Sequence, residues 1–100
     1  MILHTVLFWL KSDVPATERQ AFAQALAGLP AIGQPTFAFV GKPLAAPVAP
    51  VIDASYDHKL VLGFATAEDY AAYEHAPAHQ AFIQRFAPDW AKVVVYDAAP

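Results

Sequence analysis

The sequence predicts an α+β domain in which a four-stranded antiparallel sheet carries helices on one face. Four segments of strand length are rich in β-branched and aromatic residues. Between the first and second of them, and again between the third and fourth, apolar side chains recur at helical spacing. The chain has 100 residues, of which 57% are hydrophobic, so it can bury one core. We therefore expect one domain over residues 1–100.

Composition and charge exclude several classes of partner. The net charge is −3, and the six lysine and arginine residues are scattered singly, so no basic surface for nucleic acid is expected. Without cysteine, the chain forms no disulfide and has no catalytic thiolate. The apolar residues 1–10 lack a basic leader and the length to span a bilayer. We expect a cytoplasmic protein that binds neither nucleic acid nor membrane. The sequence has no glycine-rich phosphate-binding loop, so no cofactor is expected.

The first half of the chain predicts a strand, a helix and a second strand. Residues 2–11 form the first strand, whose alternate side chains place His4 on one face together with Ile2, Val6, Phe8 and Leu10. Capping residues at 12–13 and a proline in the first turn predict a helix over 15–28. Residues 35–41 form the second strand, and the proline at its start places it near a sheet edge. The proline-rich residues 43–55 are expected to form an extended connection that can cover a pocket mouth.

The second half of the chain predicts a strand, a broken helix and a last strand. Residues 56–64 alternate and place His58 on a face with three bulky apolar residues. Thr66–Asp69 resembles a capping box, which begins a short helix that Pro77 interrupts. The next helix turns His79 to the same side as Phe82, Ile83 and Phe86, and residues 91–97 form the final strand.

This element order matches a ferredoxin-like topology, in which the first and third strands are neighbours and helices cover one face of the sheet. The first and last strands are apolar on both faces, so the uncovered face needs a second sheet against it. A homodimer that packs sheet to sheet supplies one and accounts for the high apolar fraction. Within one subunit, His4, His58 and His79 are expected to converge on a pocket with Tyr73 nearby.

Four segments of the chain together resemble the stress-responsive A/B barrel domain (Dabb) family. They are the opening His4-Thr-Val-Leu-Phe, the Tyr56-Asp-His58 that enters a strand ending in Phe64, the Pro77-Ala-His79-Gln-Ala-Phe82 segment, and the closing Val93-Val-Val-Tyr-Asp97. The resemblance covers nearly the whole chain. It implies a dimeric α+β barrel, a fold that the family shares with small monooxygenases.

One branch of this family, a plant polyketide cyclase that performs an aldol condensation, is similar to this chain in its pocket. The similarity implies His79 as general base, Tyr73 as its assistant, and His4, His58 and Asp97 as further pocket residues. The family usually has His-Pro-x-His, whereas this chain has His75 one residue further from its proline. His75 is therefore expected at a solvated helix end.

The residues leave several functions open. His79 is either a general base, oriented by an acceptor such as Asp97, or a hydrogen-bonded core histidine. Phe82, Ile83 and Phe86 either line a pocket for a small apolar ligand or form core. No metal site is predicted, because the histidines lack a metal-binding spacing. We expect a pocket for a small carbonyl compound with cofactor-free acid-base chemistry; the alternatives are a non-catalytic ligand-binding protein and a cofactor-independent monooxygenase.

Overall fold

The computed structural model describes residues 1–45 and 48–100. It contains four strands and three α-helices in the predicted order: β1 (Ile2–Leu10), α1 (Ala16–Gly28), β2 (Phe37–Gly41), β3 (His58–Phe64), α2 (Ala67–His75), α3 (Pro77–Phe86) and β4 (Trp90–Ala98). Short 3₁₀ turns follow α1 and α3. The fold is ferredoxin-like α+β, as the sequence predicts.

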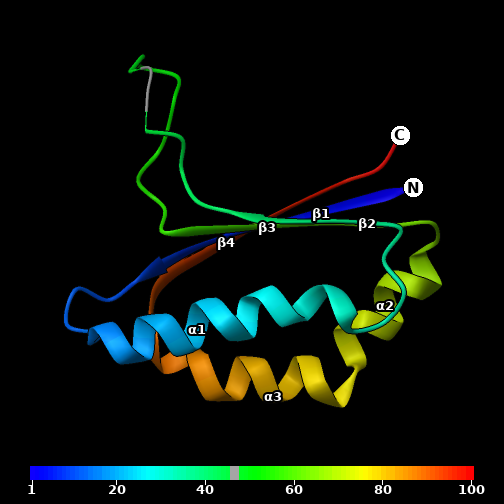
Figure 1. The fold of residues 1–100 in the computed structure, drawn as a ribbon. Coiled ribbons are helices and arrows are strands. Elements are labelled where there is room, and N and C mark those ends of the chain that lie inside the picture. The colour runs from blue at the N-terminus through cyan, green and yellow to red at the C-terminus, as the bar shows by residue number, and fades with distance from the viewer. Residues whose placement is uncertain (46–47) are drawn as a thin grey trace.

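The four strands form one antiparallel sheet in the order β2-β3-β1-β4. Helices α1 and α3 run side by side under one face, and α2 lies at one end of the sheet (Figure 1). The described parts of the segment between β2 and β3 extend away from the opposite face (Figure 1). The expected edge position of β2 and the pairing of β1 with β3 are both confirmed.

Strict alternation along β1 determines which side chains meet the helices. His4, Val6, Phe8 and Leu10 are buried, whereas their neighbours along the strand are more exposed. The register of the strand pairs determines which residues lie opposite each other on neighbouring strands. His4 lies opposite Leu62 of β3 and Asp97 of β4, whereas Phe8 lies opposite His58.

Phe22 of α1 is the centre of the core and is fully buried. Its ring contacts the ring of Phe8 at a centroid distance of 5.2 Å and that of His58 at 5.3 Å. It also contacts three aromatic residues from α3 and the start of β4, namely Phe82, Phe86 and Trp90. One residue of α1 therefore connects the sheet to the C-terminal half of α3.

The second face of the sheet has no helix over it and is apolar. Large side chains on it are about half exposed, with Phe37 at 51%, Phe39 at 52% and Tyr96 at 64%. The ring of Phe39 lies over Gly41, where a Cβ atom would come within 2.7 Å of it. Exposed apolar patches of this kind mark interaction surfaces.

The two predicted helix starts differ in outcome. Thr66 caps α2 as expected, because its hydroxyl accepts a hydrogen bond of 3.1 Å from the Asp69 amide. The prediction that residues 12–13 cap α1 is wrong. Pro15 occupies the cap position in an extended conformation with no side-chain hydrogen bond. Residues 12–13 form a turn instead, and the helix begins at Ala16, directly after Pro15.

Replacing Phe22 by Ala should lower the free energy of unfolding by about 3–5 kcal/mol, because the change removes a buried ring and leaves a cavity. Gln24, exposed on the same helix, provides the control, and Gln24→Ala should change stability by less than about 0.5 kcal/mol. Urea unfolding measures both. Equal effects of the two variants would contradict the central place given to Phe22.

Candidate functional site

Tyr73 and His79 are brought together by a sharp break between two helices. Helix α2 ends at His75, α3 begins at Pro77, and the one residue between them has an extended backbone. Proline is favoured at the first position of a helix but prevents the preceding helix from continuing through it. As a result the rings of Tyr73 and His79 face each other at a centroid distance of 4.6 Å.

A hydrogen bond determines the protonation pattern of the His79 ring. Its Nδ1 lies 3.0 Å from the backbone carbonyl oxygen of Glu74. A carbonyl oxygen only accepts, so Nδ1 carries the proton and donates it. In the neutral ring Nε2 therefore carries the lone pair, which is the form that acts as a base. The expected acceptor for this histidine was Asp97, and that expectation is wrong.

Both residues line a cavity of about 150 Å³ between the sheet and the helices. Of the predicted site residues, His4, Phe82 and Ile83 line it as well. Most of the remaining wall is apolar and comes from Val6, Phe8, Leu29, Leu60, Trp90, Val93 and Val95. An apolar cavity of about 150 Å³ holds a group the size of a benzene ring.

The Tyr73 hydroxyl is the second polar group of this cavity. Its side chain is 1% exposed, and no hydrogen bond engages its hydroxyl among residues 1–45 and 48–100. Burial, with a smaller contribution from the negative charge of Glu74, raises the pKa of Tyr73 well above its ordinary value. The hydroxyl therefore stays protonated at neutral pH and has a hydrogen bond to donate.

His4 reaches the same cavity from β1 and is held by two partners. Its Nδ1 lies 2.6 Å from Asp97 Oδ1 and 2.9 Å from the Tyr70 hydroxyl, which itself donates to Asp97 Oδ2 at 2.7 Å. Burial and the hydrogen bond to Asp97 raise the pKa of Tyr70. Asp97 thus orients His4, which lies directly across the strand pair from it.

Three predicted members of the pocket are absent from its wall. One of them is Asp97, which bonds His4 and does not line the cavity. His58 pairs with Phe8, four residues along β1 from His4, so the expected convergence of three histidines is wrong. It does not line the cavity of His79. Phe86 also lies outside the cavity wall, because it packs against Phe22 in the core. His75, as expected, is exposed at the end of α2.

The sequence did not single out several residues that the structure brings to this site. Tyr70 of α2 donates a hydrogen bond to Asp97 of β4, a link that its position on a helix did not indicate. Trp90 lines the cavity, and its buried indole Nε1 has no hydrogen-bond partner among the described residues. The sequence places Trp90 just after the last predicted helix, a position that does not indicate a cavity-lining residue.

Among residues 1–45 and 48–100, no group of three or more histidine, cysteine, aspartate or glutamate side chains is arranged to hold a metal ion. In the same ranges, none of the helices has the length and apolarity needed to cross a membrane.

Comparison with known proteins gives relatives along the whole chain. A Dabb family protein with a ferredoxin-like fold from Mesorhizobium loti is 31% identical, with a TM-score of 0.77 over 99% of this chain and 95% of that one. A dimeric ferredoxin-like protein from Thermobifida fusca is 27% identical, with a TM-score of 0.78 over 99% and 90% of the two chains.

A hydroxynitrile lyase from Passiflora edulis has the same fold, with a TM-score of 0.79 over 97% of this chain and 90% of that one, but only 18% identity. No match was found among the curated proteins. Residues 2–100 match the model of the stress-responsive A/B barrel domain, Dabb. Since that match covers almost every residue and the Mesorhizobium relative agrees with it, the chain belongs to the Dabb family.

Proposed function

We propose that this Dabb protein binds a small apolar carbonyl compound in the cavity of His79 and performs cofactor-free acid-base chemistry on it. The observation that carries the proposal is the pairing of a histidine and a tyrosine in an apolar cavity. The Nδ1–H of His79 is committed to the Glu74 carbonyl, and the Tyr73 hydroxyl has no partner among the described residues. One group is thereby suited to accept a proton and the other to donate a hydrogen bond.

In the proposed reaction His79 Nε2 takes a proton from the carbon next to the carbonyl of the substrate. The electron pair of the broken C–H bond moves to the carbonyl oxygen, where the Tyr73 hydroxyl stabilises the negative charge. The enolate carbon then attacks a second carbonyl, whose oxygen takes the proton back from His79 Nε2, so that the aldol product forms and the base is restored. This is the reaction implied by the resemblance to a plant polyketide cyclase, for which a poly-β-keto thioester is the substrate.

The size of the cavity limits how such a substrate would bind. About 150 Å³ holds a group of benzene size, so only the reacting end of a longer chain fits within it. His4, held by Asp97 and Tyr70, adds a third polar group at the opposite wall, and its ring lies 6.0 Å from that of Tyr73. The hydroxynitrile lyase with the same fold supports the view that this architecture accommodates an enzyme.

We also propose that the protein is a homodimer that packs through the open faces of its two sheets. The half-exposed aromatic residues of that face support this arrangement, as does the dimeric relative from Thermobifida fusca. Burying these side chains in the interface stabilises the dimer by about 25 cal/mol for each Å² of apolar surface removed from water.

Replacing His79 by Ala should reduce turnover of a poly-β-keto thioester by at least about 100-fold, because the proton acceptor is lost. His75 offers a matched control, since it is exposed and bonds the Ala71 carbonyl within α2. His75→Ala should leave turnover unchanged. Product formation followed by chromatography measures both, and circular dichroism checks that the melting temperatures stay within a few degrees. Full activity of the His79 variant would refute the assigned base.

Replacing Tyr73 by Phe should lower kcat by about 100-fold, because the ring still packs but the developing oxyanion loses its donor. Gln24→Ala changes an exposed side chain of α1 that lies in neither cavity wall and should leave kcat unchanged. A Tyr73 variant with only a raised KM would show that the hydroxyl binds substrate without stabilising the transition state.

Sedimentation at micromolar concentration should give the mass of a dimer for the unmodified chain and of a monomer for Phe39→Asp, since a buried unpaired carboxylate opposes association. Gln24→Glu adds the same charge to an exposed site on α1 and should remain dimeric. A monomeric unmodified chain contradicts the proposed interface.

A further inference from the structure

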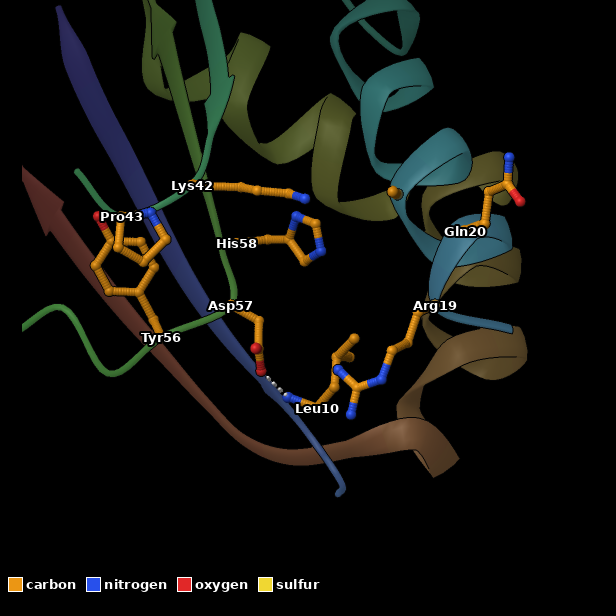
Figure 2. A pocket seen from close by; sticks show the side chains of 9 residues that line it. Leu10, Arg19, Gln20, Lys42, Pro43, Tyr56, Asp57 and His58 are labelled. Carbon is orange, nitrogen blue, oxygen red and sulfur yellow. Dashed lines mark hydrogen bonds between the residues drawn. The ribbon is translucent and has the colours of Figure 1, made fainter. Parts of the chain in front are cut away.

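A second cavity, of about 460 Å³, lies toward the Leu10 end of β1 and does not include His79. It opens between the first half of α1 and the strand ends where the segment between β2 and β3 departs (Figure 2). Its wall is formed by Leu10, Arg19, Gln20, Ala23, Lys42, Pro43, Tyr56, Asp57 and His58. The resemblance implies His58 as a pocket residue, but the proposed acid-base chemistry gives this cavity no role.

Three basic side chains from three separate parts of the chain line this cavity: Arg19 from α1, His58 from β3, and Lys42 from the residue after β2. Lys42 and His58 extend from the strand side toward α1, and Arg19 extends from α1 toward the strands (Figure 2). The one carboxylate of the wall, Asp57, accepts a hydrogen bond of 2.7 Å from the Leu10 amide. The cavity therefore carries a net positive charge, although the whole chain has a net charge of −3.

The Arg19 guanidinium is held in place by the backbone. Its Nε donates to the Val14 carbonyl at 3.0 Å, and its Nη2 donates to the Lys11 carbonyl at 2.7 Å. Neither acceptor carries a charge, so the positive charge of Arg19 is not neutralised by an acidic partner among the described residues. An arginine fixed in this way has lost its side-chain freedom before any ligand binds, which reduces the entropy cost of binding.

His58 provides an independent indication of a ligand. Its side chain is only 8% exposed, yet neither ring nitrogen has a hydrogen bond among residues 1–45 and 48–100. Burial, followed by the positive charge of Lys42, lowers the pKa of His58; Arg19 acts in the same direction and Asp57 against it. Ring nitrogens that line a cavity without a protein partner are available to form a hydrogen bond with a ligand there.

We propose that this cavity binds the anionic head group, a carboxylate or a phosphate, of a small organic molecule. Arg19 and Lys42 supply the charge, and His58 supplies a hydrogen bond from a neutral ring. The apolar side chains of Leu10, Ala23 and Pro43 and the ring of Tyr56 would contact the organic part. Charge-assisted hydrogen bonds of this kind are about twice as strong as neutral ones.

The test is a titration of the isotope-labelled full chain, followed through its backbone amide resonances at low ionic strength and neutral pH in a buffer without phosphate. The probes are inorganic phosphate, phenyl phosphate and benzoate. Saturable shifts are expected at the amides of Lys42, Asp57 and His58. Tighter binding of phenyl phosphate identifies a phosphate head group, and tighter binding of benzoate identifies a carboxylate.

Two variants separate a specific site from general charge attraction. Lys42→Gln should weaken the binding of the preferred probe by about tenfold, because one charged donor is lost. Lys42 is exposed, so this variant is expected to fold. Lys11→Gln removes the same charge from an exposed side chain outside the cavity wall and should leave the dissociation constant unchanged. The proposal is overturned if no probe gives saturable shifts, or if the two variants weaken binding equally.

Discussion

Aromatic packing around Phe22 is the constraint on which the rest of this structure depends. The fully buried ring contacts Phe8, Phe82 and Trp90, which line the cavity of His79, and it also contacts His58, which lines the second cavity. It lies in neither wall itself. The hydrophobic layer centred on Phe22 therefore separates two hollows under the same sheet. The aromatic rings fill the space between the two cavities, so His4 and His79 lie at one of them and His58 at the other.

The two hollows differ in how their polar groups are satisfied, and the difference indicates different ligands. In the first cavity His4 and His79 each have a fixed partner for Nδ1, whereas the Tyr73 hydroxyl and the Trp90 indole have none among the described residues. Its wall is otherwise mostly apolar, which suits a neutral carbonyl compound. The second cavity gathers positive charge instead, which suits an anion. A buried polar group without a partner is rare in proteins, so the Trp90 indole favours binding of a ligand in the first cavity.

The open face of the sheet relates the site to assembly. The side chains of β1 point alternately to the cavity and to the open face, so His4 and Val6 line the cavity while Leu3 and Thr5 belong to the other surface. A partner that covers the open face would therefore hold the same strand that carries His4. The backbone of β1 links the proposed dimer interface to the proposed active site, and damage to one surface is expected to reach the other through this strand.

The sequence by itself determined the faces. Alternation along β1 and β3 placed His4 and His58 on the helix side, and helical phase turned His79, Phe82 and Ile83 inward. Tertiary structure decided the neighbours. A shift of two residues in strand pairing leaves every side chain on the same face, so the pattern did not reveal that His58 lies opposite Phe8 or that Asp97 lies opposite His4. The pairing partners are far apart in the chain, and the packing of α1 and α3 against the sheet settles which of them meet.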